Sequence, residues 1–180
     1  MIYFSPDWRW DDEREHLALV GSRLVRRCGT RDPFKIAEDI GIDVLFCNDF
    51  GSLKGMYRVI KRNRFIFINE DLPEWLQRIV CAHELVHDQF HRHLAKNNPI
   101  QEFMLYDMRS KPEYEANIVA AEILLKNDEL LEYIYQYRYS AEQIARATHT
   151  DINLVALKIA HLNQLGYDLR PIDHRSNFLK

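Results

Sequence analysis

A segment at positions 81–91, CAHELVHDQFH, has residue types and spacing that could bind a metal ion. His83 and His87 are four positions apart, so on a helix their imidazoles project from one face and can hold a single ion. Zinc takes nitrogen or oxygen ligands near 2 Å in a roughly tetrahedral arrangement, and catalytic sites leave one position to water. Glu84 lies about 100° around the helix from His83, where a general base for that water belongs. The segment therefore predicts zinc ligands at His83 and His87 and a catalytic base at Glu84.

The alternative to a metal site is an exposed, histidine-rich surface helix. Random placement gives the HExxH spacing in roughly 2–3% of chains of this composition, so the motif alone is insufficient. Most residues around the histidines are apolar: Val80, Cys81, Ala82, Leu85 and Val86. This composition predicts a buried helix, where histidines need polar partners and a metal supplies one. The metal interpretation is therefore favoured.

His91 extends the series by one more helical turn. On a straight helix His83 and His91 lie about 12 Å apart along the axis, whereas two ligands of one zinc are about 4 Å apart. The two residues cannot share an ion, so the ligand pair is His83 with His87 or His87 with His91. The first pair has Glu84 in the base position, whereas the second has Asp88 there, with a shorter side chain. The first pair is favoured.

A third ligand is expected from the acidic residues of the segment PEYEANIVAAEILL, residues 112–125. Glu113 and Asn117 are one helical turn apart, so if Glu113 binds the ion, Asn117 can face the same site and orient a ligand. Glu115 is predicted to point roughly the other way. Glu122 lies among alanines in the apolar part of the segment, where a structural hydrogen bond is expected.

The elements that position these residues follow from hydrophobic periodicity and turn signals. Strands are predicted at 42–47, 54–61 and 64–69, and the last could hold a substrate by strand addition. Helices are predicted near 17–28 and 33–40, through the histidine segment, over 113–126, and in most of the remaining chain. The stretch from His93 to Lys111 is predicted to be a long loop. The order predicts an α+β fold with a small three-stranded sheet and a helical C-terminal half.

Composition limits the other classes of function. The chain has 180 residues with a net charge of −3 and a sequence pI of about 6.2, so no overall basic field favours nucleic acid. No apolar run is long enough to cross a bilayer, and the N-terminus lacks a signal-peptide pattern. Three cysteines without CxxC spacing indicate a reducing compartment. These features predict a cytoplasmic protein without membrane contact.

The quoted segments together resemble the ImmA/IrrE-type metallopeptidases, which are associated with bacteria, phages and mobile elements. HELVHDQFH is similar to the family pattern HELGH-x-x-x-H, and EYEANIVAAEILL is similar to E-x-E-A-N-x-F-A-A-x-L-L. LKGMYRVIKRNRFIFIN resembles the strand pair that precedes the zinc helix in the family. The likeness spans roughly residues 53–165. Two departures are Val86, where the family usually has Gly, and the absence of Met-Pro after Leu124 and Leu125.

The resemblance implies a zincin-like, thermolysin-type core at residues 1–126, with a helix-turn-helix-like segment at 127–180 packed against it. It also implies one Zn²⁺ per chain, held by His83, His87 and Glu113, with Asn117 behind a ligand. In the expected reaction zinc lowers the pKa of a bound water, and Glu84 accepts the proton before passing it to the leaving amine. The sequence offers four candidate donors to the oxyanion without choosing among them: Tyr57, Tyr106, His149 and His161. The substrate implied by the resemblance is a helix-turn-helix repressor, cleaved to induce phage or mobile-element genes.

Two other functions remain open from the sequence. The segment SAEQIARATHTDINLVALKIAHL, at 140–162, has a helix-turn-helix rhythm and could belong to a DNA-binding regulator. Its second helix offers only Lys158 and two histidines as polar or cationic readers, whereas phosphate binding needs several Lys or Arg. Direct binding of nucleic acid is therefore not expected. The other alternative is a zinc-containing regulatory protein that binds a partner without proteolysis, for which the ligands would be the same.

Overall fold

A computed structural model describes residues 8–96, 99–102, 105–106 and 108–170 of the chain. Within this part are seven α-helices and one short 3₁₀ helix. Their bounds are α1 (Trp8–Cys28), α2 (Pro33–Asp39), α3 (Glu74–Phe90), η1 (Leu94–Lys96), α4 (Lys111–Leu124), α5 (Asn127–Tyr135), α6 (Ala141–Ala147) and α7 (Ile152–Gln164). The outer ends of the predicted two-part division, 1–7 and 171–180, lie outside the described residues. The boundary at residue 126 stays a prediction.

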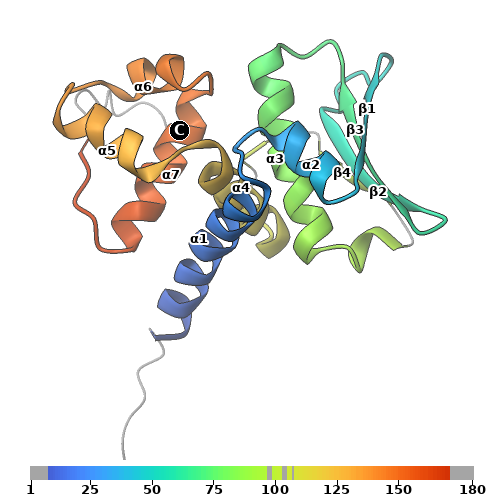
Figure 1. The fold of residues 1–180 in the computed structure, drawn as a ribbon, viewed down its shortest axis with the longest axis horizontal. Helices are drawn as coiled ribbons and strands as arrows, with labels where there is room; N and C mark the ends of the chain where they lie inside the picture. Colours follow the sequence, from blue (N-terminus) through green and yellow to red (C-terminus); the bar gives the residue numbers. More distant parts are fainter. Residues whose placement is uncertain (1–7, 97–98, 103–104, 107, 171–180) are drawn as a thin grey trace, which may run out of the picture.

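The described residues form one sheet of four strands in the order β1-β3-β2-β4 (Figure 1). The strands are β1 (Asp43–Cys47), β2 (Gly55–Ile60), β3 (Asn63–Asn69) and β4 (Ile100–Glu102). Strand β1 is parallel to β3, while β2 is antiparallel to both β3 and β4. The α+β class is confirmed, but the prediction of a three-stranded sheet was wrong by one strand. At three residues, β4 is too short to show an alternating apolar pattern, and only its pairing with β2 makes it a strand.

Strand β3 lies inside the sheet and not at its edge. Residues Phe65–Asn69 pair with β1 on one side, and the strand pairs with β2 along almost its whole length on the other. A peptide cannot add to a strand whose two edges are already hydrogen-bonded. The prediction that residues 64–69 bind a substrate by strand addition was therefore wrong. The outer strands of the described sheet are β1 and β4.

Several helix ends follow directly from the sequence. Asp32 caps α2 by accepting a hydrogen bond from the Phe34 amide at 3.0 Å, with Pro at the first turn, as predicted. The predicted capping box of Ser140 and Gln143 at α6 is confirmed. Helix α4 is shifted by two residues from the predicted 113–126, because Ser110 caps it by accepting from the Glu113 amide.

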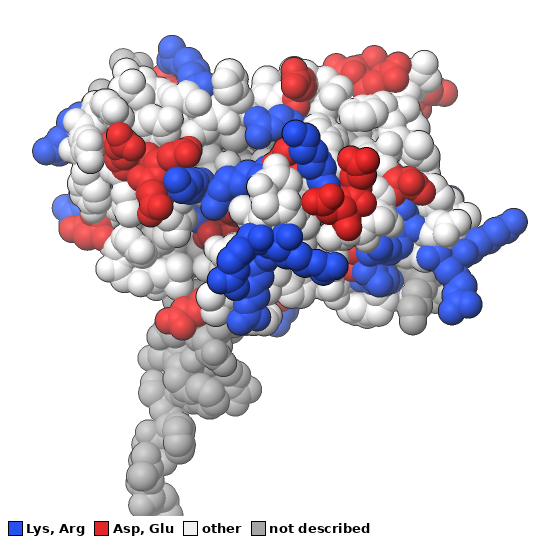
Figure 2. Space-filling view, in the orientation of Figure 1, with Lys and Arg blue, Asp and Glu red and all other residues white. Residues whose placement is uncertain are grey.

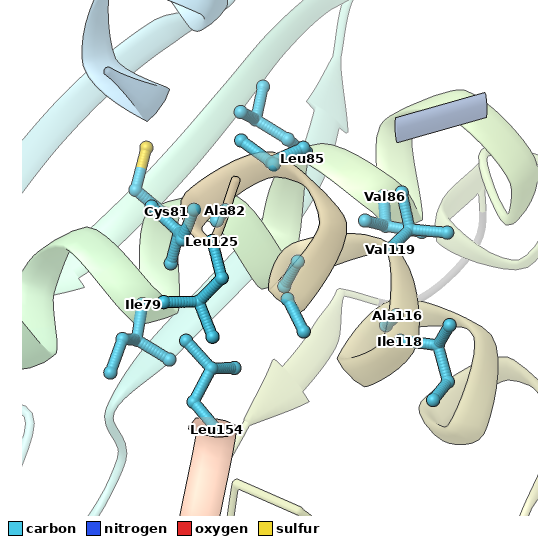
Figure 3. Packing of buried hydrophobic residues seen from close by; sticks show 14 of the residues in the cluster. Ile79, Cys81, Ala82, Leu85, Val86, Ala116, Ile118, Val119, Leu125 and Leu154 are labelled. Carbon is cyan, nitrogen blue, oxygen red and sulfur yellow. The ribbon is translucent and has the colours of Figure 1, made fainter. Parts of the chain in front are cut away.

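Helix α4 lies in the middle of the molecule and connects its two halves (Figure 1). Helix α3 packs against the sheet and α2 with one part of its surface and against α4 with another. On its other sides α4 contacts α1 and α7. Figure 3 shows apolar side chains of α3, α4 and α7 in one cluster, which includes Leu85, Val119 and Leu154. Burial of Ile79–Asp88 in α3 and of Ala116–Leu124 in α4 makes these parts of the two helices a rigid support for the polar groups that they carry.

The charged residues on the surface and the apolar character of the helices bear on nucleic-acid and membrane binding. Figure 2 shows basic and acidic side chains in separate small groups, with uncharged residues over much of the face. None of the described helices has the length and apolar character needed to span a membrane.

Candidate metal centre

The polar residues of α3 lie in the most buried part of the helix. Every residue from Ile79 to Asp88 is buried, and His83, Glu84 and His87 are at most 1% exposed. Burying three ionisable groups next to each other is unfavourable unless each finds a partner. The helix is held in place by its apolar residues, so the polar ones cannot turn toward solvent. They must be satisfied inside the protein.

The structure brings His83, His87 and Glu113 together. The Nε2 atoms of the two histidines are 3.0 Å apart. Glu113 lies with Oε2 at 3.1 Å from Nε2 of His83 and Oε1 at 3.6 Å from Nε2 of His87. One donor atom from each residue lies within 4.8 Å of the others. Ligands of one zinc ion at about 2 Å are separated by about 3–4 Å, so the three side chains fit a shared divalent cation.

Asn117 lies behind His83, as the sequence predicted for a residue one turn after Glu113. Its Oδ1 is 3.1 Å from Nδ1 of His83 and also accepts a hydrogen bond from the Tyr106 amide at 3.4 Å. An amide oxygen can only accept, so Nδ1 of His83 carries the proton in this contact. Nε2 is therefore the ring nitrogen that faces His87 and Glu113, where a cation would take the place of its proton.

Glu84 lies beside this group with its carboxylate fully buried. Among the described residues, neither of its oxygens accepts a hydrogen bond of normal geometry. Burial raises its pKa to about 8, with the negative charges of Glu102 and Glu113 adding to the rise and His83 opposing it. Gly55 leaves the space that this carboxylate needs, since a Cβ there would lie 3.0 Å from Oε1. An unpaired buried carboxylate with a raised pKa is typical of a general acid–base.

Glu102 is a site residue that the sequence analysis missed. It lies on β4, is 5% exposed, and places Oε2 at 3.1 Å from Nε2 of His83. Burial disfavours a charge on His83, but the hydrogen bonds to Glu102 and Glu113 outweigh this and raise its pKa to about 10. Burial and the neighbouring His83 and His91 lower the pKa of His87 to about 2. In the sequence, Glu102 is marked only by its acidic type and its position between HELVH at 83–87 and EYEAN at 113–117.

His91 and Glu115 also differ from the expectation. Glu115 was predicted to point away from the site, but its Oε2 lies 2.8 Å from Nε2 of His91. The reason is that His91 lies one helical turn after His87. Helix α4 therefore contacts His91 through Glu115 and contacts His83 and His87 through Glu113. His91 does not join the donor group around Glu113; its Nδ1 lies 3.0 Å from Nδ1 of His87.

The four candidate oxyanion donors lie in different places. The hydroxyl groups of Tyr57 and Tyr106 donate hydrogen bonds to Asp88 and Asp151, at 2.7 and 2.9 Å. Burial raises the pKa of both tyrosines, and their carboxylate partners raise it further. His149 is exposed in the turn after α6, and His161 is buried with Nε2 at 3.9 Å from Oε1 of Glu122. Their assignment as oxyanion donors stays a prediction.

Comparisons with known proteins point to one family. Residues 37–159 match the M78 peptidase family, described as the IrrE N-terminal-like domain. The chain is 32% identical to uncharacterized immunity region protein 2 of Bacillus phage phi105 over 80% of this chain and 86% of that protein. It is 30% identical to metallopeptidase ImmA of Bacillus subtilis strain 168 over 68% of this chain and 71% of that protein.

No solved structure matches the chain significantly. The family match covers more than half of the chain and includes all three residues of the donor group. We conclude that the chain belongs to the ImmA/IrrE-type metallopeptidase family, M78.

Proposed function

We propose that this protein is a zinc-dependent endopeptidase. The observation that carries the proposal is the buried carboxylate of Glu84, which has no side-chain hydrogen-bond partner among the described residues, beside three converging metal donors. Two imidazole nitrogens and one carboxylate are the ligand set of several catalytic zinc sites, which leave a fourth position open. We further propose that α3, α4 and the sheet form a zincin-like core of the thermolysin type.

The proposed chemistry divides its tasks among the residues of the site. A bound zinc ion supplies a polarised water and a Lewis acid for the scissile carbonyl. Glu84 would accept a proton from the attacking water and pass it to the leaving amine. His83, His87 and Glu113 hold the cation, and Asn117 fixes the ring of His83.

The edge of the sheet suggests where a substrate main chain would bind. Of the two outer strands, β4 is the one that carries a residue in contact with the donor group, Glu102. We propose that a substrate peptide pairs with β4, the outer strand that carries Glu102. We propose a helix-turn-helix repressor as the substrate, which fits the relative named as a phage immunity-region protein. Since such a repressor acts on DNA in the cytoplasm, we propose that the peptidase acts there too.

Direct recognition of DNA by the C-terminal helices is less well supported. Lys158 was the one cationic residue that the sequence offered on the second helix of this segment. It is fully buried, and its Nζ lies 2.5 Å from Oε1 of Glu122. A side chain in this position cannot contact a phosphate without breaking the ion pair. We therefore propose that α6 and α7 support α4 and do not read DNA.

Cleavage can be tested with repressors encoded near the gene for this protein. Each repressor is incubated with the zinc-loaded protein, with and without a chelator, and the products are measured by intact-mass spectrometry. We expect two fragments whose masses sum to the substrate plus one water, and no fragments with the chelator.

Glu84→Gln is the matched control, because it keeps the size of the side chain and removes the base. It should bind one zinc per chain and lower the rate by about 10²–10⁴-fold. Full activity of this variant would exclude the proposed mechanism. A wild-type protein that binds zinc but cleaves none of the repressors would instead favour a zinc-containing regulatory protein.

A further inference from the structure

Both ring nitrogens of His87 have a polar partner. One partner, His91, lies on the side away from the metal donors, and the proposed function gives it no role. Nε2 of His87 faces the metal donors, 3.0 Å from Nε2 of His83. Its Nδ1 lies 3.0 Å from Nδ1 of His91, and Nε2 of His91 lies 2.8 Å from Oε2 of Glu115. These contacts form a hydrogen-bonded series that connects His87 on α3 through His91 to Glu115 on α4. Both histidines are buried, at 1% and 4% exposure.

The proton positions in this hydrogen-bonded series follow from the donors and acceptors that each group offers. A neutral imidazole carries one proton, on only one of its two nitrogens. If Nε2 of His87 binds a cation, the proton of His87 must be on Nδ1, which then donates to Nδ1 of His91. His91 can accept there only if its own proton is on Nε2. That proton points at Glu115, whose carboxylate accepts it.

The reverse arrangement would prevent metal binding. A proton on Nδ1 of His91 would force Nδ1 of His87 to accept, and the proton of His87 would then lie on Nε2. An N–H bond would point at the place where the cation binds. For a neutral His91, the carboxylate of Glu115 disfavours this arrangement, because it leaves Nε2 of His91 facing a carboxylate without a proton between them.

We propose that His91 and Glu115 are positioning residues, which act through two hydrogen bonds in series to keep the Nε2 lone pair of His87 free for the metal. The inference depends on the proposed metal site and adds residues that act behind it. Asn117 does the same for His83 through one direct contact of 3.1 Å. His83 is thus oriented by Asn117, and His87 is oriented, through His91, by Glu115. Asn117 and Glu115 both lie in the first two turns of α4. The helix that supplies the Glu113 ligand therefore also orients the two histidines.

Two variants test the proposal by zinc affinity, measured by competition with a chromophoric chelator. Glu115→Met removes the acceptor for Nε2–H of His91 while keeping the length of the side chain, and His91→Phe removes the acceptor for His87 while keeping a ring in the buried space. We expect each variant to weaken zinc binding by about 10–100-fold, the range found for groups that orient metal ligands. The thermal unfolding of the metal-free proteins shows whether the fold is kept. If His91→Phe does not fold, Glu115→Met decides, because the side chain of Glu115 is partly exposed.

Lys111→Gln is the matched control. Lys111 is the other partner of Glu115, with Nζ at 3.6 Å from Oε1, and its side chain is 68% exposed. Removing it leaves both hydrogen bonds of His91 intact, so zinc affinity should stay within about twofold of wild type. Zinc affinity of Glu115→Met that equals this control would overturn the proposal.

A second readout observes the tautomers directly. Long-range ¹H–¹⁵N correlation spectra of the zinc-loaded, histidine-labelled protein should show His91 with an unprotonated Nδ1 and a protonated Nε2. They should show the proton of His87 on Nδ1. A purely structural role for His91 would not require this tautomer, and a protonated Nδ1 of His91 in the loaded wild type would contradict the proposal.

The outcomes also separate this inference from the proposed function. Zinc binding and tautomers can be measured whether or not any peptide is cleaved, so a protein that binds zinc but has no activity leaves the inference standing. Loss of the expected affinity difference in an active enzyme removes only the inference. A wild-type protein that binds no zinc would overturn both.

Discussion

Helix α4 carries two buried polar clusters that differ in how their charges are arranged. Near its N-terminus, Glu113 meets the two histidines of α3. Nearer its C-terminus, Glu122 meets Lys158 of α7, with the ion pair at 2.5 Å and both side chains at most 3% exposed. Arg31 completes this second region by donating to the carbonyl oxygens of Glu122 and Ile123, each at 2.8 Å.

The difference shows how a site for a cation can be distinguished from a structural ion pair. In the second cluster a buried carboxylate has a cationic side chain as its partner, so the charges are balanced within the chain. In the first cluster, electron-pair donors converge from two helices, and Glu102 and Glu84 add two more carboxylates close by. Such a group requires protons or a cation to be stable. Helix α4 therefore carries a charge-balanced ion pair near its C-terminus and a site that needs protons or a cation near its N-terminus.

The largest effect is expected when a donor is removed from the first cluster. His83→Ala should weaken zinc binding by about 10³-fold or more, because about 10–16 kcal/mol of binding free energy is shared among a few ligands. Chelator competition measures this change. His149→Ala is the control, since His149 is exposed and lies outside the cluster. Retention of tight zinc binding by His83→Ala would show that the donor group is not the metal site.

In the second cluster the corresponding change should affect stability and not metal binding. Lys158→Met leaves the buried carboxylate of Glu122 without its cation, which should lower the free energy of unfolding by about 3–5 kcal/mol. Denaturant unfolding measures the loss. Lys126→Met, in an exposed pair with Glu129, should change it by at most about 1 kcal/mol. If Lys158→Met lost zinc affinity as well, the two clusters would not be independent.

Two glycines allow the same substitution to be made beside each cluster. A Cβ on Gly21 would lie 2.5 Å from Cβ of Glu122, and a Cβ on Gly55 would lie 2.4 Å from Cγ1 of Val80 and 3.0 Å from Oε1 of Glu84. Each change to Ala should lower the free energy of unfolding by about 1–3 kcal/mol. Only Gly55→Ala should also lower peptidase activity, because it displaces Glu84. Equal peptidase activity of Gly21→Ala and Gly55→Ala would contradict the assignment of a catalytic role to the region around Glu84 alone.

The smallest effect concerns the pH dependence of metal binding. In the metal-free protein His83 is protonated at pH 6, because its pKa is raised to about 10. Zinc must displace this proton, so apparent affinity should rise about tenfold per pH unit as pH increases toward that value. Calorimetric titration at pH 6 in two buffers of different ionisation enthalpy should show release of about one proton per zinc. Release of none would mean that His83 is neutral before zinc binds.

The agreement between sequence and structure is best where the signal is local. Caps at Asp32 and Ser140, three of the four strands and the buried character of α3 were predictable, because each depends on neighbouring residues. The errors concern contacts between distant segments. Strand β4 exists only through its pairing with β2, and the orientation of Glu115 depends on where α4 meets His91. Glu102 could not be recognised as a site residue without knowing that pairing.

The sequence by itself determined the chemistry that is available: two histidines and a glutamate on one helix, and an acid with an amide one turn later on another. Helical periodicity is enough for this, since residues three and four apart share a face. Only the tertiary structure decided which carboxylates reach those histidines. Packing of α3 against both α4 and the sheet brought Glu113 and Glu102 to His83 and brought Glu115 to His91. The physical reason is that distances between elements depend on how their apolar faces pack together, and no local pattern records that packing.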